Sequence, residues 1–154
     1  MRLHTDIPSR AEIDALLQIK ETWCATLYVP TDPASNGEPE RIDLKNRTRD
    51  VRDRLTKAGA DDEAITAIEQ QLTELGEDEA FWRYQARILA LFVTPSSLVT
   101  FRLPNRLAPL VGVGDRFHVK PLMRAVTFPQ TAFVLALAQG SVRLFELVPD
   151  VPLQ

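Results

Sequence analysis

Basic side chains are concentrated in one stretch of this sequence, from Glu40 to Leu55. On a helix that turns about 100° per residue, four of them lie on one narrow stripe beside the apolar face. Like charges at this spacing repel one another, so the stripe requires a negative charge from outside the helix. The acidic segment that follows in the chain can supply it, most directly through Glu69 and Glu74, and so can RNA phosphate or an acidic partner. The stripe consists of Arg41, Lys45, Arg49 and Arg52.

Three other basic residues of the same helix have a local explanation. Arg47, Arg54 and Lys57 each follow an acidic residue by four positions, and this order favours an ion pair within the helix. They therefore need no function beyond a solvated helix surface. The acidic residues are Asp43, Asp50 and Asp53.

Residues suited to catalysis or to metal binding are few. The two histidines, His4 and His118, and the single cysteine, Cys24, have none of the spacings that are typical of metal sites. Asp115 and His118, with Arg116 between them, are the candidates for a secondary site, although a D-R-F-H segment more often orients a loop than catalyses a reaction. We therefore predict that the chain is not an enzyme and that it binds no cofactor and no metal.

Composition narrows the class of protein further. A chain of 154 residues that is 45% hydrophobic has the length of one ordinary domain and can bury a core. Its net charge of -3 argues against a protein that coats nucleic acid, so an RNA site has to be local. No segment reaches the roughly 18 apolar residues of a membrane span, and the N-terminus lacks the apolar core of a signal peptide. We predict a cytoplasmic protein without a membrane partner, and its oligomeric state stays open.

Two helices separated by a short link carry the basic stripe and the acidic segment. Gly59 suits the position after the end of the first helix, and Asp61 can cap the second. The short link predicts an antiparallel helical hairpin. Each helix shows mostly apolar residues at the three- and four-residue spacing of one helix face. These positions are Leu44, Thr48, Val51 and Leu55 in the first helix and Ile65, Ile68, Leu72 and Leu75 in the second.

The rest of the chain combines short helices with strands. Ser9 and Glu12 have the pattern of a capping box, which predicts a first helix. The predicted inner face of this helix consists of Ile13, Leu16, Leu17 and Lys20. Together with the helical hairpin, these elements predict an α+β fold, in which a mostly antiparallel sheet packs with the hairpin and with short flanking helices. Apolar runs predict strands at Cys24–Val29, Ile88–Val93, Ser97–Leu103 and Leu110–Val113, a later helix at Phe117–Val126, a β-hairpin at Ala132–Leu147 and a loop at Pro30–Pro39.

Several segments of the chain resemble one protein family. They include L-Y-V-P-T, K-N-R in the basic helix, F-W-x-x-Q before L-A-L-F, D-R-F-H-V-K-P-L-M and V-L-A-L-A-Q-G-S-V-R-L-F-E, and they extend from about Leu27 to Glu146. This combination resembles the N-terminal domain of the bacterial release-factor-like proteins, relatives of the archaeal and eukaryotic class-1 peptide-chain release factor. The resemblance implies a longer natural chain in which residues 1–128 form that domain. Residues 129–154 would then form a terminal β-hairpin at the start of a second domain.

The resemblance does not extend to the residues that act in the class-1 factor. There the N-terminal domain reads the stop codon, and the next domain hydrolyses peptidyl-tRNA through a Gly-Gly-Gln loop, which this sequence lacks. Only Lys45 remains of the Asn-Ile-Lys-Ser motif, and only Phe117 remains of the Tyr-x-Cys-x-x-x-Phe motif, so Phe117 is expected in the core. The lost groups are those suited to reading bases.

The resemblance therefore implies a noncatalytic domain that binds the ribosome or structured RNA in translation without reading stop codons. An alternative is a protein–protein interaction module that keeps the fold but not the RNA binding. That alternative predicts a basic stripe neutralised within the helical hairpin and an exposed apolar patch elsewhere, around the terminal β-hairpin. The RNA-binding candidates are Arg41, Lys45, Asn46, Arg47, Arg49 and Arg52.

Overall fold

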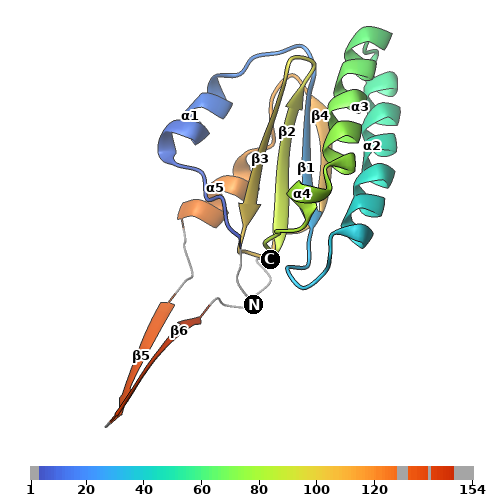
Figure 1. The fold of residues 1–154 in the computed structure, drawn as a ribbon. Helices are drawn as coiled ribbons and strands as arrows, with labels where there is room; N and C mark the ends of the chain where they lie inside the picture. The colour runs from blue at the N-terminus through green and yellow to red at the C-terminus, as the bar shows by residue number, and fades with distance from the viewer. Residues whose placement is uncertain (1–3, 128–131, 139, 148–154) are drawn as a thin grey trace.

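The chain forms the α+β fold that the sequence predicts (Figure 1). The computed structural model describes residues 4–127, 132–138 and 140–147. Four strands form one antiparallel sheet with helices on its two faces, and two further strands form a separate hairpin. The helices are α1 (Arg10–Gln18), α2 (Glu38–Ala58), α3 (Asp62–Glu77), α4 (Glu79–Trp82) and α5 (Lys120–Thr127). The strands are β1 (Cys24–Pro30), β2 (Ile88–Thr94), β3 (Ser97–Leu103), β4 (Leu110–Gly114), β5 (Ala132–Ala138) and β6 (Ser141–Leu147).

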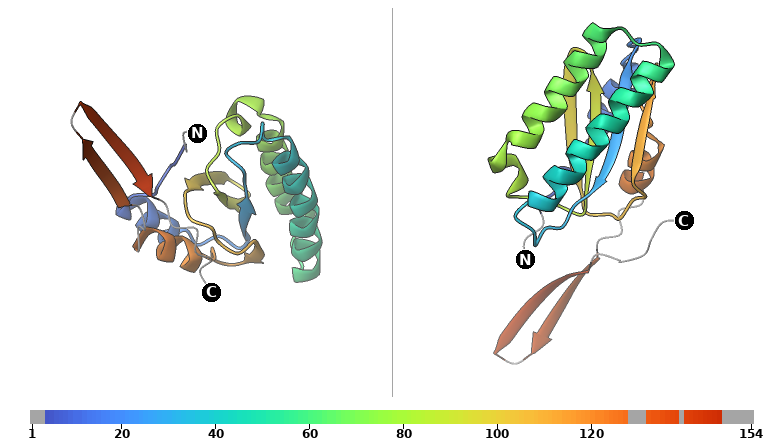
Figure 2. Two further views of the ribbon diagram at one scale, coloured as in Figure 1. Left: turned by 90° about the horizontal axis from the view of Figure 1, so that it is seen from below. Right: turned by 90° about the vertical axis from the view of Figure 1, so that its right-hand side faces the viewer.

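The four-stranded sheet has the order β3-β2-β1-β4 and is antiparallel throughout. Leu27 of β1 lies opposite Leu91 of β2 on one side and opposite Val111 of β4 on the other. The two central strands are buried almost throughout, because helices cover both faces of the sheet (Figure 2). This double coverage explains why their sequences are continuously apolar and do not alternate with polar residues.

The predicted helical hairpin is α2 and α3, and it covers one face of the sheet (Figure 2). Its predicted inward positions are confirmed, since all are buried except Leu75, which is partly buried, and they pack against apolar side chains of β1 and β2. Gly59 ends α2 in the left-handed conformation, and the carboxylate of Asp61 accepts a hydrogen bond from the N–H of Ala64. These two caps lie where the sequence predicts them and define the turn between the helices.

Helices α1 and α5 cover the opposite face, where Tyr28 is fully buried. The Tyr28 hydroxyl donates a 2.8 Å hydrogen bond to the carbonyl of His118 and accepts one of 3.3 Å from the N–H of Leu122. Burial raises the pKa of Tyr28 well above its usual value. Phe117 packs edge-on against Phe92 with ring centroids 5.3 Å apart, which confirms its predicted place in the core. Tyr28 thus ties the segment before α5 to the centre of the sheet.

The prediction for α1 is correct at the N-terminal end of the helix and wrong near its C-terminal end. Ser9 and Glu12 form the predicted capping box, in which each side chain accepts a hydrogen bond from the backbone N–H of the other residue. Ile13 and Leu16 are buried as predicted, but the prediction for Leu17 is wrong, because its side chain is 48% exposed. The prediction for Lys20 is also wrong, because the helix ends at Gln18 and Lys20 is exposed. Successive residues are about 100° apart around a helix, so the buried position of Leu16 turns Leu17 toward solvent.

Helix α2 begins inside the segment that was predicted as a loop. Gly37 adopts the left-handed conformation with a φ of 83°, and Pro39 occupies the first turn, where a missing N–H costs no hydrogen bond. The buried carboxylate of Glu40 accepts hydrogen bonds from the N–H of Asp32 (2.9 Å) and from the hydroxyl of Ser35 (2.7 Å). These bonds fold the preceding segment over the start of the helix, so the loop is shorter than predicted.

The terminal β-hairpin is confirmed as strands β5 and β6. Their pairing places Leu135 opposite Leu144 and Leu137 opposite Val142, so these four aliphatic side chains share one face of the hairpin. Val142 and Leu137 are 71% and 70% exposed, and the other two are more than half exposed. The hairpin projects away from the four-stranded sheet (Figure 1 and Figure 2). The predicted domain boundary between residues 128 and 129 lies outside the described residues.

Candidate anion-binding groove

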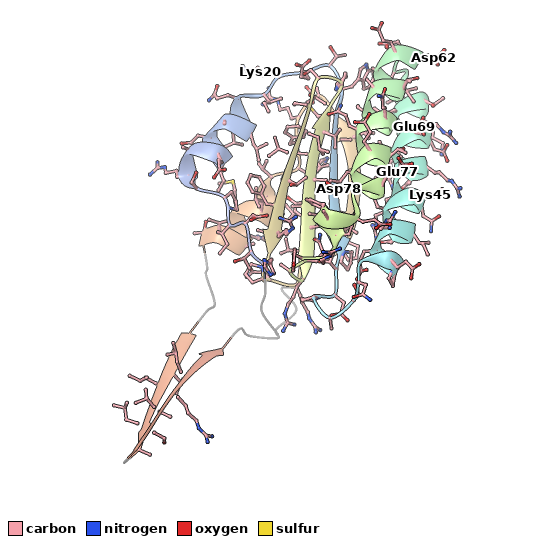
Figure 3. All side chains as sticks on the ribbon, viewed as in Figure 1. Lys20, Lys45, Asp62, Glu69, Glu77 and Asp78 are labelled. Atoms are coloured by element: carbon pink, nitrogen blue, oxygen red, sulfur yellow. The ribbon has the colours of Figure 1, made fainter. Side chains whose placement is uncertain are left out.

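A groove of about 530 Å³ follows the seam between α2 and α3. Side chains of both helices border it, and Figure 3 shows Lys45 on α2 and Glu69 and Glu77 on α3. The groove therefore brings the basic stripe of one helix beside acidic residues of the next. Its basic residues are Arg41, Lys45, Arg49 and Arg52, and its acidic residues are Glu38, Glu69 and Glu77.

At one end of the groove, α3 neutralises the stripe. Nη1 of Arg52 lies 3.5 Å from Oε1 of Glu69, which confirms one of the two acids predicted to face the stripe. The pair is partly exposed, so it contributes at most about 1 kcal/mol to stability. The prediction for Glu74 is wrong: its carboxylate accepts a 2.8 Å hydrogen bond from Gln70 on its own helix. Glu74 is displaced from Glu69 by about 140° around α3 and so faces away from α2.

At the other end, the C-terminal turn of α3 holds Arg41. Nε of Arg41 donates a 2.7 Å hydrogen bond to the carbonyl of Gly76, and its Nη1 lies 3.7 Å from Oε1 of Glu79 in α4. Carbonyl groups in the last turn of a helix have no partner within the helix and form the negative end of its dipole. A guanidinium group is therefore stabilised at this position, and Arg41 is bonded within the protein.

Between these ends, two cations of the stripe remain available. Lys45 and Arg49 are exposed, and neither has a hydrogen-bond or ion-pair partner among the described residues. Thr73 lines the same section from α3, one turn after Glu69, and the described part of the chain offers its hydroxyl no partner either. The stripe thus divides into two neutralised arginines at the ends and two unpaired cations in the middle.

Arg47 and Arg54 form ion pairs within α2, as the sequence predicts. Nε of Arg47 lies 2.8 Å from Oδ2 of Asp43, and Nε of Arg54 lies 2.8 Å from Oδ1 of Asp50. The hydrogen bond from Arg54 lowers the pKa of Asp50 below its usual value. Arg47, although predicted as an RNA contact, is thus engaged by its own helix and does not line the groove.

Asn46 and Lys57 are two further residues of α2 for which a contact was predicted. Asn46 is exposed but is not among the residues that line it. Within residues 4–127, 132–138 and 140–147, no ion pair joins Lys57 to Asp53. Of the six RNA-binding candidates, Lys45 and Arg49 are therefore the two that combine a place in the groove with an unpaired charge.

The secondary-site candidates lie in the turn between β4 and α5. Asp115, Arg116 and His118 are exposed, and no hydrogen bond joins Asp115 to His118 in the described part of the chain. The backbone of His118 is anchored to β1, because its N–H donates a 3.0 Å hydrogen bond to the hydroxyl of Thr26 and its carbonyl accepts one from Tyr28. The described residues also include no group of three or more His, Cys, Asp and Glu side chains placed to hold a metal ion. The turn has a clear structural role.

The imidazole ring of His118 packs on β4 at Gly112. A Cβ atom at Gly112 would lie 2.8 Å from Cδ2 of His118, so a glycine is required for the ring to lie there. Since Phe117 enters the core and His118 is bonded to β1, α5 begins at Lys120 and not at Phe117 as predicted.

No family model and no curated protein matches this sequence. The resemblance to release-factor-like proteins therefore stays a prediction, and the function has to be inferred from the residues of the groove. In the part of the chain that the structure describes, no helix combines the length and the apolar character that a membrane crossing needs. The single cysteine, Cys24, is buried and not in a disulfide.

Sequence patterns alone did not reveal the complete groove. The sequence does indicate Thr73, because this neutral residue lies four positions after Glu69 and four positions before Glu77, on the same side of the helix. The carbonyl of Gly76 has no such signal, since a backbone carbonyl becomes available through the ending of a helix and not through the type of residue.

Proposed function

We propose that this chain is a noncatalytic RNA-binding domain that acts in translation and holds ribosomal or other structured RNA at the groove between α2 and α3. The observation that carries the proposal is a pair of exposed and unpaired cations, Lys45 and Arg49, in a groove whose other arginines are neutralised. These two side chains can bind phosphate without breaking an ion pair inside the protein. Each phosphate contact of this kind releases counterions from the RNA and so favours binding.

The groove is suited to contacts with phosphates and not with bases. Its described lining contains no aromatic side chain, so it offers no surface for stacking of an unpaired base. Contacts of Lys and Arg with phosphate position an RNA but do not read its sequence. This chemistry agrees with a domain that binds RNA without reading stop codons. The net charge of -3 further limits RNA binding to a local basic site.

The resemblance to bacterial release-factor-like proteins supports the assignment to translation. Lys45 is the residue retained from the class-1 motif that meets RNA, and it is one of the two unpaired cations in the groove. Under this proposal, the chain is the N-terminal domain of a longer cytoplasmic protein whose other domains carry any further activity.

The test is the binding of structured RNA or of ribosomes at several salt concentrations. Replacement of both Lys45 and Arg49 by Glu removes two phosphate contacts, and we expect the slope of log affinity against log salt to decrease in magnitude by about 1.4–1.8. The matched control carries Arg54→Glu and Lys57→Glu, which makes the same change of charge on the same helix outside the groove. We expect the control to keep most of the affinity. A wild-type affinity that does not depend on salt, or an equal loss in both double variants, contradicts the proposal.

A second candidate function, a protein–protein interaction module, is favoured by the apolar face of the β5–β6 hairpin. A two-stranded sheet is marginally stable in water by itself, and an exposed group of aliphatic side chains is typical of a contact surface. The face consists of Leu135, Leu137, Val142 and Leu144.

A pull-down with and without nuclease distinguishes the two candidates. A protein partner that is retained after nuclease treatment, and lost when Leu137 and Val142 are replaced by Lys, favours the interaction module. Recovery of ribosomes that is lost after nuclease treatment favours RNA binding. The two Lys substitutions lie on an exposed face, so they are expected to leave the four-stranded sheet intact.

A further inference from the structure

The middle of the groove differs chemically from its two ends. At the ends, Arg52 and Arg41 each meet a negative group contributed by α3. In the middle, two unpaired cations of α2 share the groove with a neutral hydroxyl of α3. We propose that this middle section is a seat for a single phosphate-type oxyanion, bound by Lys45, Arg49 and Thr73. The inference rests on the proposed RNA-binding function and specifies where one phosphate of the RNA is held.

The leucines on the floor of the groove are already buried in the core. Leu44 and Leu72 line it, but each is only 1% exposed because both side chains pack in the core. Thr48 lies beside them and donates its hydroxyl to the carbonyl of Leu44 over 2.9 Å. Among the described lining residues, Ile42 is the large apolar side chain that is exposed, at 63%. An apolar helix docked here would bury little more of Leu44 and Leu72, so the charged side chains distinguish this groove as a binding site.

The charges and donors of the middle section match one phosphate group. Lys45 and Arg49 bring two positive charges, whereas a phosphodiester carries one negative charge and a phosphate monoester carries nearly two. The guanidinium of Arg49 presents paired N–H donors that fit two phosphate oxygens, and the ammonium of Lys45 acts as a point charge. The hydroxyl of Thr73 adds a neutral donor from the opposite helix.

The acidic residues of the groove restrict the seat to its middle. Glu38 and Glu77 line the groove near Arg41, and Glu69 lies at the opposite end beside Arg52. A second phosphate near either end would face these carboxylates, and the repulsion would cost free energy. The arrangement therefore favours one anion at a time over a continuous track of phosphates along α2.

Inorganic phosphate is the probe for the seat, titrated into isotope-labelled protein while backbone amide shifts are followed by NMR. We expect saturable shifts centred on residues 45–49 and on Thr73, and binding about tenfold weaker in Lys45→Gln or Arg49→Gln. Thr73→Val keeps shape and charge, and we expect it to bind phosphate about threefold to tenfold more weakly. Arg47→Gln removes a positive charge from the same helix outside the groove and is expected to bind like the wild type. Shifts that do not saturate, or that Arg47→Gln weakens equally, overturn the proposal.

Competition between phosphate and a structured RNA separates this inference from the proposed function. If RNA displaces bound phosphate and Thr73→Val weakens RNA binding, the result supports both the seat and the RNA-binding function. Phosphate that saturates the seat while RNA fails to bind supports the seat, as a site for free phosphate or a phosphorylated small molecule, and refutes the RNA-binding function. The third outcome is RNA binding that is lost without Lys45 and Arg49, is unchanged in Thr73→Val, and leaves phosphate bound. This outcome supports the RNA-binding function and refutes the seat.

Discussion

The Tyr28 hydroxyl links the sheet to the segment that leads into α5, and its removal tests how this side of the fold is held. Tyr28→Phe keeps the aromatic ring but removes a donor to the carbonyl of His118 and an acceptor for the N–H of Leu122. Both backbone groups then lose a hydrogen-bond partner on the covered face of the sheet. We expect the free energy of unfolding to fall by about 2–4 kcal/mol at neutral pH.

The same hydroxyl also makes stability depend on pH. Burial raises the pKa of Tyr28 in the folded state, whereas the phenol of the unfolded chain ionises at about pH 10. Above that pH the unfolded state loses a proton that the folded state keeps, so the stability linked to Tyr28 is full below about pH 10 and decreases as the pH rises. For one group, linkage gives a loss of about 0.4 kcal/mol at pH 10 and about 1.4 kcal/mol at pH 11. The difference in stability between wild type and Tyr28→Phe should shrink by these amounts.

Urea denaturation at several pH values measures this difference, and tyrosinate absorbance measures the ionisation directly. Tyr84→Phe is the matched variant, because Tyr84 is half-exposed and its removal leaves Tyr28 as the single tyrosine of the chain. In folded Tyr84→Phe, we expect no tyrosinate signal between about pH 10 and pH 11, and a signal as soon as the protein is denatured. Ionisation of the folded variant near pH 10, or a stability difference that stays constant with pH, would refute the reasoning.

Two more predictions concern a buried thiol and a crowded glycine. Cys24 is buried and desolvation raises the pKa of its thiol, so a thiol reagent at neutral pH is expected to modify it only as fast as the protein unfolds. Rapid modification of the native protein would show that Cys24 is accessible. Gly112→Ala places a Cβ atom 2.8 Å from the ring of His118, which is exposed and has to turn to another rotamer. We expect thermal unfolding to report a loss of about 0.5–1.5 kcal/mol that His118→Ala largely relieves, and an unchanged melting temperature in Gly112→Ala would mean that the ring moves aside freely.

Local patterns were sufficient to predict most elements of the fold. Apolar spacing places residues such as Leu44 and Ile68 on the inner faces of their helices, because helix geometry alone determines which side chains share a face. The predicted starts of two helices were wrong because tertiary contacts decide them. Helix α2 starts inside the predicted loop because the carboxylate of Glu40 accepts hydrogen bonds from that loop. Helix α5 starts after its predicted first residue because Phe117 enters the core. A single sequence does not show which distant groups will make such contacts.

The same division applies to the charged groove. The pair of Arg47 with Asp43 was predictable, since both residues belong to one helix and their separation is set by its pitch. Contacts across the seam depend in addition on the rotation of α3 relative to α2, which the apolar positions of α3 indicate, and on the shift of one helix along the other, which the sequence does not specify. That rotation selects Glu69 over Glu74 as the partner of Arg52. It therefore also decides that the unpaired cations are the middle two of the stripe.

Strands β1 and β2 are direct neighbours in the sheet, and Pro30 pairs with Ile88 where the chain leaves one strand and enters the other. The whole segment 31–87, with both long helices, is thus an insertion whose two ends are held together by the sheet. The groove is formed by α2 and α3 alone. We expect a different helical hairpin, grafted between the same two ends, to leave the strand register unchanged if its inward face stays apolar. The residues of the proposed anion site therefore all lie on this insertion, and the four-stranded sheet contributes none of them.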